Sequence, residues 1–387
     1  MRVRKMAAIV LAGAIVVGLA PAAVAQEVTP AVTLEADRTK IPWGDKVRLS
    51  GAVSPAEEGA VVEVVDQAGA LVGTATTGAD GTYSLSFSPQ KNVTLVARRL
   101  EIQSDPVTVR VKPKVKVALY HVRLFGRALV TGNVQPALAG QRVTLTLLRH
   151  GKPVATKKVR VNDGRFFKAR FRIRKPGKHR VHAAVSPADM LGASDKSRAH
   201  NTPLPSLSPG GESLYVKLLE WRLRDLGYYL PGANRVFDHK TVDALIAFAK
   251  VQRVARNATV NADTWRRLAS PIKPRPRAKS RFHIEIDQTR QVIFVVKNSK
   301  VRWILHTSTG KPSTPTYDGV YKVWSKVAGY SPKRLYYPSF FHGQRGIHGW
   351  PEVPTYAASH GCARVPMWAA QWIYGLADIG TTVRVYH

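Results

Sequence analysis

The sequence predicts a multidomain protein with two β-sandwiches, a small three-helix module and a β-rich C-terminal domain. The chain has 387 residues, which exceeds what one hydrophobic core usually serves. Short alternating apolar stretches between Gly, Asp and Pro turns fill the segment before residue 200. Helical spacing replaces them after residue 212, and strand-like runs of branched and aromatic residues return after residue 281. These changes of period predict the order of the domains.

The first 25 residues are predicted to be a secretory signal. The positive leader carries Arg2, Arg4 and Lys5. An uncharged apolar run over 6–20 follows, and small residues at 23–25 form a cleavage site. The run is shorter than the roughly 20 apolar residues that span a bilayer. We therefore expect cleavage after Ala25 rather than a membrane anchor, and no transmembrane segment after cleavage.

The charge is strongly positive. The formal net charge of +34 falls to +31 when the three leader cations are removed. Such a field concentrates anionic polymers near the surface in a salt-dependent way. The cations are spread through every segment, which is unlike a groove that reads nucleic acid. For an exported chain we expect anionic wall polymers as partners and no nucleic acid.

Two segments, 26–112 and 113–200, are predicted to be copies of one β unit. Gly51, Pro55 and Gly59 recur 81 positions later, and Asp80-Gly81 and Tyr83 recur 83 positions later as Asp163-Gly164 and Phe166. We expect the matching glycines to occupy turns. The alternating strands predict antiparallel sandwiches that resemble immunoglobulin-like (Ig-like) modules of bacterial surface proteins. A spacer or adhesive stalk is the expected role.

A polar segment rich in Pro, Ser and Gly over 194–213 is predicted to be a linker, with the domain boundary drawn at 201–211. Three helices are expected after it, the first ended by Gly227, the second capped by Asp238 and the third starting near Asn261. The segments LLEWRLRDLGYY, RVFDHKTVDALIAFAKVQ and VNADTWRRL resemble the small peptidoglycan-binding module of wall hydrolases, over 212–269. A basic, proline-rich linker is predicted at 270–280.

The chemistry is predicted to lie between Gly346 and Arg364, where the sequence reads GIHG, ten further residues, and SHGCAR. Cys362 is the single cysteine and therefore makes no internal disulfide. A nucleophilic thiol needs a nearby base or positive field, which His348 or His360 would supply. Gly361 lets the backbone approach a bound carbonyl, and amides around Gly361 and Cys362 are candidate oxyanion donors.

Two other readings of this segment remain open on the residues alone. Cys362 would be a small buried hydrophobe, as most free cysteines are. Alternatively, His348, His360 and Cys362 would supply three zinc ligands, although no C-x-x-C or H-E-x-x-H pattern accompanies them.

The segment resembles the catalytic domain of the L,D-transpeptidases, or YkuD family, over 281–387. The motif S-H-G-C-x-R with an upstream His-Gly carries the resemblance, together with the stretch TGKPSTPTYDGVYKV. The resemblance implies that Cys362 is the nucleophile, His348 the general base and the Gly349 carbonyl its orienting partner. It also implies that His360 keeps the site polar, that Ser359 and Arg364 shape the site or meet substrate carboxylate, and that neither metal nor cofactor is used.

An aromatic stretch around Tyr337, followed by Trp350, is predicted to be either a flap over the substrate or core. We assign Tyr337 and Trp350 as candidate substrate contacts.

The expected function is cell-wall L,D-transpeptidation, in the cell wall or periplasmic space. Cys362 would attack the L,D-bond of a tetrapeptide stem, release D-alanine and pass the acyl group to an amine, giving 3-3 cross-links. Peptidoglycan stem peptides and glycan are the expected partners. A wall-binding adhesion or scaffold protein with an inactive catalytic fold is the alternative from another class, and a cysteine L,D-carboxypeptidase or endopeptidase is a third reading.

Overall fold

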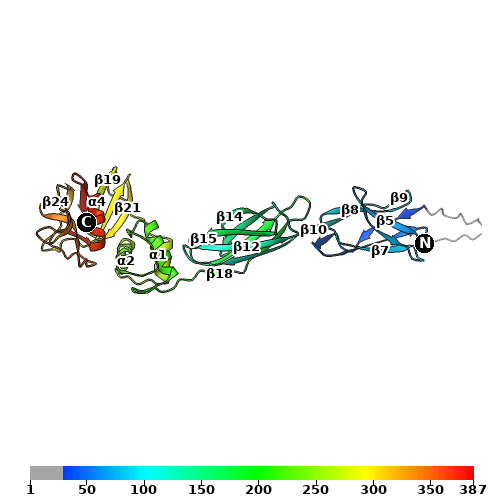
Figure 1. Ribbon diagram of the computed structural model, residues 1–387, viewed down its shortest axis with the longest axis horizontal. Coiled ribbons are helices and arrows are strands. Elements are labelled where there is room, and N and C mark those ends of the chain that lie inside the picture. Colours follow the sequence, from blue (N-terminus) through cyan, green and yellow to red (C-terminus); the bar gives the residue numbers. More distant parts are fainter. Residues whose placement is uncertain (1–28) are drawn as a thin grey trace, which may run out of the picture. The chain divides into compact units, whose positions relative to one another are not determined.

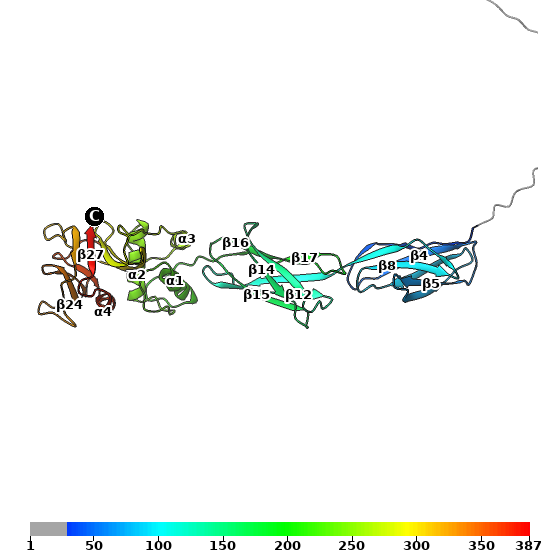
Figure 2. The ribbon, with the colours of Figure 1, turned by 90° about the horizontal axis from the view of Figure 1, so that it is seen from above.

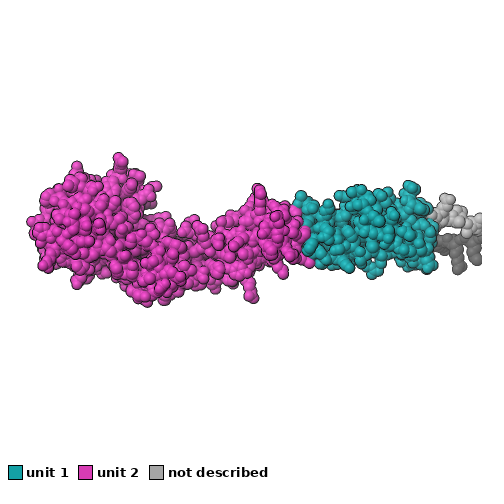
Figure 3. All heavy atoms as spheres, in the orientation of Figure 1, with its two compact units in different colours: residues 1–112, 188–191 teal, residues 113–187, 192–387 magenta. Residues whose placement is uncertain are grey.

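The computed structural model of the protein describes residues 29–387. The predicted signal peptide lies outside the described residues. The chain forms two compact units, which Figure 3 colours separately. Unit 1 contains the described residues up to Lys112 together with 188–191, and unit 2 contains 113–187 and 192–387.

Unit 1 is built from two sheets, whose strands are blue to cyan in Figure 1. In the first sheet, β4 pairs with β1, β2 and β7, and the second has the order β3-β10-β8-β5-β6 with β9 on β8. The strands are β1 (Ala31–Val32), β2 (Glu35–Ala36), β3 (Lys40–Pro42), β4 (Val47–Ser54), β5 (Val61–Asp66), β6 (Leu71–Thr76), β7 (Thr82–Phe87), β8 (Val93–Arg99), β9 (Ile102–Gln103) and β10 (Val107–Lys112). Alternate apolar side chains face inward, as Val47 and Leu49 do.

Unit 2 begins with a second pair of sheets. The first has the order β11-β12-β15, and the second has the order β14-β13-β16-β17 with β18 on β16. The strands are β11 (Lys114–Tyr120), β12 (Arg127–Gln135), β13 (Arg142–Arg149), β14 (Lys152–Arg160), β15 (Phe166–Arg172), β16 (Lys178–Val185), β17 (Ala193–Lys196) and β18 (His200–Asn201). We call these strands the second sandwich. Its core contains Leu145, Phe167 and Phe171.

The repeat between the two β units is present, but its register differs from the prediction. Gly51 and Gly132 lie inside strands, opposite Tyr83 and Phe167, rather than in turns. A Cβ on Gly132 would lie 2.2 Å from the Phe167 ring, so the glycine makes room for the facing aromatic residue. Tyr83 therefore corresponds to buried Phe167 and not to exposed Phe166, because the sequence match did not show which of two adjacent phenylalanines faces the core.

Three helices follow at the expected places. They are α1 (Leu214–Asp225), α2 (His239–Gln252) and α3 (Ala262–Ala269). Asp238 caps α2, and Asn261 caps α3 through a reciprocal bond with Thr264. Gly227 has φ +95° directly after α1, a conformation that glycine adopts without strain. We call residues 212–269 the helical module.

The C-terminal domain has two sheets and one helix. The first sheet has the order β21-β20-β19-β27-β22 and the second β23-β24-β25-β26. The elements are β19 (Phe282–Asp287), β20 (Val292–Lys297), β21 (Lys300–His306), β22 (Gly319–Lys322), β23 (Ser325–Lys326), β24 (Tyr336–His342), β25 (Arg345–Trp350), β26 (Ala363–Pro366), α4 (Met367–Leu376) and β27 (Thr382–Tyr386). The β-forming run 319–327 is divided into two strands, β22 and β23, that belong to different sheets.

The helical module and the C-terminal domain share one hydrophobic core. Buried residues of all three helices, such as Leu219, Phe248 and Trp265, belong to the same cluster as Phe294 and Ile304 of β20 and β21. Figures 1 and 2 show the helices beside these strands. The chain between them, predicted as a linker, is hydrogen-bonded to the domains: the Gln252 side chain exchanges two bonds with the backbone of Ile272.

Aromatic side chains also pack where the helical module meets the C-terminal domain. The ring of Tyr229 stacks between Trp368 and Trp372 of α4, with centroid distances of 5.6 and 3.8 Å. The Trp368 indole donates to Asp243 of α2 at 2.7 Å. Such packing fixes the helical module against α4 of the C-terminal domain. None of the helices in the described part of the chain is long and apolar enough to cross a membrane.

Candidate active site

Cys362 directly precedes β26, which runs parallel to β25. The register places Ile347 opposite Ala363 and His348 opposite Arg364. Because side chains alternate along a strand, His348, Cys362 and Arg364 project from the same face of this sheet. Sγ of Cys362 lies 3.5 Å from the backbone nitrogen of Gly346, at the start of β25. Two adjacent strands thus place the predicted nucleophile and base on one face of the sheet.

The loop that carries Cys362 is folded by Ser359. Its buried hydroxyl donates to the Cys362 carbonyl at 2.6 Å and accepts from the Gly361 amide at 3.0 Å. The Gly361 amide is therefore used within the loop, which removes one of the two oxyanion donors that we expected from the sequence. Ser359 therefore fixes the conformation of the loop that carries Cys362.

The stretch 309–316 supports this loop from the outside. Lys311 donates its amide to the Ser359 carbonyl at 2.9 Å, and Thr314 donates its hydroxyl to the same atom at 3.0 Å. Thr316 donates to the Gly361 carbonyl at 2.9 Å while accepting from the Gly310 amide at 2.9 Å. These bonds explain why the segment TGKPSTPT accompanies the cysteine motif in the sequence.

His348 is buried and oriented. Its Nδ1 lies 2.9 Å from the carbonyl of Gly349, and burial is the main cause that lowers its pKa, to about 4. The neutral imidazole therefore keeps its proton on Nδ1, donates it to that carbonyl, and leaves Nε2 as a proton acceptor. This is the tautomer that a general base requires.

Cys362 is half-buried and its surroundings are polar. Burial raises the pKa of the thiol, and the Gly346 amide, Arg345, Arg364 and Lys333 act in the opposite direction. The sulfur also lies 3.7 Å from the carbonyl of Gln344. The site is therefore not the sealed apolar pocket that a purely structural cysteine would occupy.

Arg345 is a site residue that the sequence did not indicate. Gly361 has φ +108°, and a Cβ there would lie 2.7 Å from Nε of Arg345. The same Nε donates to Pro315 at 3.2 Å, and the guanidinium lies 4.5 Å from the Tyr317 ring centroid. Arg345 belongs to no motif, and only the close approach at Gly361 reveals its place beside the nucleophile.

The other predicted residues are divided between two places. Trp350 lies with the catalytic group, because its ring contacts His348 at 5.7 Å and the Arg364 guanidinium at 5.2 Å. Tyr337 instead packs against Tyr374 of α4 at 5.1 Å and belongs to the edge of the core. His360 is exposed on the loop.

A buried lysine of the helical module reaches the strands behind the site. Nζ of Lys250 donates to the carbonyls of Gln291 and Thr307 at 2.8 and 2.9 Å and to Nδ1 of His306 at 2.7 Å. Nε2 of His306 bonds to the carbonyl of Val353, in the segment between His348 and Cys362. Burial lowers the pKa of His306 to about 3. Burial also lowers the pKa of Lys250, but the three acceptors around Nζ bind the three protons of its ammonium form. The neutral imidazole therefore accepts from the lysine and donates to the loop.

The arrangement fits acyl transfer through a cysteine nucleophile. A thiol, a neutral imidazole on the same face and a tightly turned backbone are the groups that this chemistry needs. Among residues 29–387, no group of three or more His, Cys, Asp or Glu side chains is arranged to hold a metal ion.

Two segments of the chain each match a known protein family. Residues 281–385 match the L,D-transpeptidase catalytic domain (YkuD), and residues 44–111 match a bacterial Ig domain. The chain therefore carries an L,D-transpeptidase catalytic domain and a bacterial Ig domain, as the resemblances in the sequence implied. No curated protein matches the chain.

Solved L,D-transpeptidases are among the structures similar to this chain. The enzyme of Xylanimonas cellulosilytica (residues 123–326) is 29% identical, with a TM-score of 0.46, over 48% of this chain and 100% of that one. The enzyme of Stackebrandtia nassauensis is 25% identical, with a TM-score of 0.31, over 48% and 97%. An Enterococcus faecium L,D-transpeptidase C442S mutant is 27% identical, with a TM-score of 0.25, over 28% and 50%.

Proposed function

We propose that the protein is an exported cell-wall L,D-transpeptidase with Cys362 as its nucleophile. The observation that supports the proposal is the shared face of β25 and β26, which carries Cys362 and the neutral, oriented imidazole of His348 inside a segment that matches the L,D-transpeptidase catalytic domain. The predicted signal over 1–25 supports export, and peptidoglycan stem peptides are the proposed substrate.

In the first half-reaction, Sγ of Cys362 attacks the carbonyl of the L,D-bond of a tetrapeptide stem. His348 takes the thiol proton on Nε2 and returns it to the leaving amine, so that D-alanine departs and a thioester remains. The backbone amide of Cys362 is the proposed oxyanion donor, since the Gly361 amide is used by Ser359. Arg364, which interacts electrostatically with Cys362, and Trp350, whose ring contacts Arg364, are the proposed contacts for the stem.

In the second half-reaction, an amine attacks the thioester and His348 again serves as the base. An amine from a neighbouring stem gives a 3-3 cross-link, whereas water gives L,D-carboxypeptidation. We propose cross-linking as the main outcome. The scaffold alternative requires an unreactive Cys362, and a half-buried thiol on the same strand face as a neutral, oriented imidazole favours the enzyme.

The test is to incubate the signal-free protein with purified tetrapeptide monomers and to identify the products by mass spectrometry. We expect release of D-alanine, a 3-3 dimer, and a covalent adduct of Cys362 with a carbapenem. Cys362→Ala is expected to abolish all three, and His348→Ala to slow them at least about a hundredfold.

Lys240→Met, in the first turn of α2 and outside the site, is the control and should retain most of the activity. Absence of both adduct and D-alanine release from the folded wild-type protein would establish the scaffold reading. Cleavage of another bond of the stem would establish an endopeptidase.

A further inference from the structure

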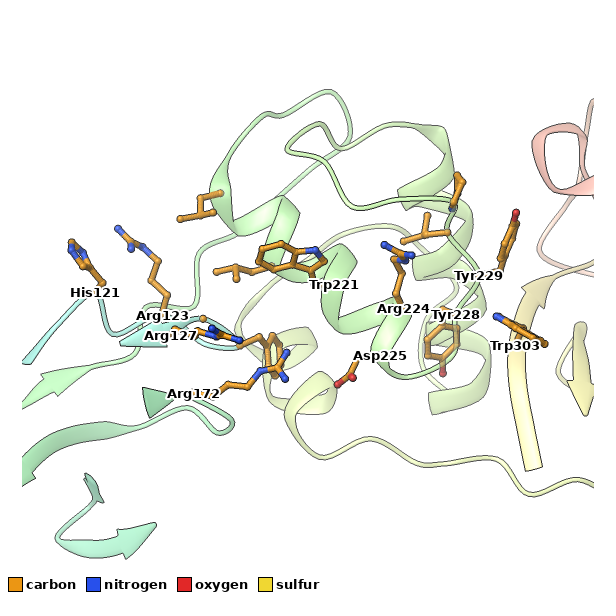
Figure 4. A pocket seen from close by; sticks show the side chains of 16 residues that line it. His121, Arg123, Arg127, Arg172, Trp221, Arg224, Asp225, Tyr228, Tyr229 and Trp303 are labelled. Carbon is orange, nitrogen blue, oxygen red and sulfur yellow. The ribbon is translucent and has the colours of Figure 1, made fainter. Parts of the chain in front are cut away.

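A groove of ≈ 1040 Å³ runs along α1, far in sequence from the catalytic residues. Its walls come from the second sandwich and from the helical module, and Trp303 of β21 borders one end. Figure 4 shows the side chains of His121, Arg123, Arg127 and Arg172 on the sandwich side and those of Trp221, Arg224 and Tyr228 on the helical side.

The groove has walls held by a packed junction. Phe125, at the sandwich end, is buried in the core of the helical module, and its ring lies 6.1 Å from that of Trp265. The guanidinium of Arg222 lies 5.1 Å from the Phe125 ring, and its Nε donates to the Leu268 carbonyl at 2.9 Å. Because a shared core holds both walls, the spacing of the side chains across the groove is defined.

The groove is rich in positive charge that no carboxylate balances. Its lining contains four arginines, Arg123, Arg127, Arg172 and Arg224. Within the described chain, none of the four has a carboxylate oxygen within 4.0 Å. The one acidic residue of the lining, Asp225, is held by Arg222 at 2.8 Å. Guanidinium groups gathered without counter-charges are suited to carboxylate or phosphate groups of a ligand.

One wall also offers an aromatic surface. Trp221 of α1 is 45% exposed, which is high for so large an apolar side chain. Nζ of Lys217 lies 5.2 Å from the ring centroid. An exposed indole flanked by cations fits a ligand that has both an apolar ring face and anionic groups.

We propose that this groove binds a saccharide chain that carries carboxylate or phosphate groups. The arginines hold the anionic groups, and a sugar ring lies against Trp221. Trp221 is the indole of the lining that is available to a ligand, because Trp303 packs edge-on against Trp372. Of the two tyrosines, Tyr228 is buried and Tyr229 already stacks with Trp368 and Trp372. Single-stranded nucleic acids are held by successive stacked aromatic side chains, so the groove favours a saccharide. The proposed binding does not depend on catalytic activity. It rests on the proposed function only for the location of the protein in a cell wall.

The test measures binding calorimetrically with the signal-free Cys362→Ala chain, so that turnover does not interfere. The probes are peptidoglycan glycan strands without stem peptides, which carry carboxylates, and a phosphomannan, whose sugar rings carry phosphates. A neutral chitooligosaccharide, polyglutamate and a single-stranded oligonucleotide complete the set. We expect salt-dependent binding of at least one acidic polymer, and the pair of polymers shows which anion the groove takes.

Matched variants distinguish binding in the groove from attraction to the overall positive charge of the protein. Arg127→Gln with Arg172→Gln is expected to weaken binding at least about tenfold. Arg142→Gln with Arg160→Gln removes the same charge from two exposed positions that lie opposite each other on β13 and β14. This pair should change binding less than about twofold. Trp221→Ala is expected to weaken binding about tenfold, while Phe166→Ala, at another exposed aromatic residue, should have no effect.

Three outcomes would overturn the proposal: equal weakening by both arginine pairs, polyglutamate binding as tight as the acidic saccharides, or preferred binding of the oligonucleotide. Because binding is measured in a chain without the thiol, failure here leaves the tetrapeptide assay unaffected. Loss of D-alanine release in that assay likewise leaves this result unaffected.

Discussion

The resting state of the catalytic pair follows from burial. Burial lowers the pKa of His348 to about 4 and raises the pKa of Cys362, so each group is neutral near pH 7. A thiolate and an imidazolium do not form in advance. The proton must therefore move during attack, with His348 as a general base rather than as the cation of a preformed ion pair.

This resting state predicts how alkylation of Cys362 by iodoacetamide depends on pH. The reaction needs the thiolate, so its rate should be below that of free cysteine at pH 7 and should rise through pH 9 without a plateau. Arg345→Gln removes a charge that favours the thiolate and should slow alkylation at pH 8.5, whereas Arg334→Gln, on an exposed loop, should not. A plateau reached near pH 7 would show a preformed thiolate–imidazolium pair instead.

Single residues differ in how far the sequence reveals them. Cys362 and His348 are visible because their spacing follows from two adjacent parallel strands and the turn between them. Arg345 is invisible because it acts through space, over a glycine that lies 16 positions away. Tyr337 was chosen for its aromatic ring, and the sequence did not show that this ring would meet Tyr374 of α4.

At the scale of elements, local patterns predict a strand or helix well and its partners less well. The caps at Asp238 and Asn261 mark the helix starts because a side-chain oxygen accepts a nearby amide. The run 319–327 is rich in β-forming residues, yet β22 pairs with β27 and β23 with β24. Pairing is a long-range choice that residues within the strand do not encode alone.

Lys250 gives a prediction about how α2 is joined to the catalytic domain. Lys250→Met should remove the donor to the Gln291 and Thr307 carbonyls and to His306. We expect the free energy of unfolding to fall by about 2–3 kcal/mol, because buried acceptors are left unsatisfied. Carbapenem acylation should also slow, since His306 holds the backbone at Val353 between the two catalytic residues.

Lys240→Met, in the first turn of the same helix, is the control and should leave both thermal unfolding and acylation unchanged. An unchanged melting temperature for Lys250→Met would show that the three bonds do not stabilise the junction.

At the scale of the whole molecule, the shared core is what the sequence did not predict. Prolines and basic residues over 270–280 suggested a spacer, and the sandwiches suggested a stalk. Instead, Leu124 and Phe125 of the second sandwich are buried with helices α1 to α3 and with strands β20 and β21. Apolar residues in a connecting loop carry no periodic signal, so their burial depends on tertiary contacts that a pattern does not contain.

The shared core predicts different results for two truncations. A chain of residues 113–387 contains all of unit 2 together with residues 188–191 of unit 1, and it should keep the thermal stability of the catalytic unit. A chain of residues 206–387 loses Leu124 and Phe125 and uncovers Trp265, so its free energy of unfolding should fall by about 2–4 kcal/mol. Both chains should turn over soluble tetrapeptide at similar rates, because β25 and β26 are intact.

Unfolding is followed by tryptophan fluorescence, and Phe125→Ala in the 113–387 chain is the matched variant. It should reproduce much of the loss, since its ring contacts Trp265 and carries the Arg222 guanidinium. Equal stability of the two truncated chains would mean that the second sandwich is only a spacer. A loss confined to the shorter chain and to Phe125→Ala would show that the sandwich stabilises the unit that carries the active site.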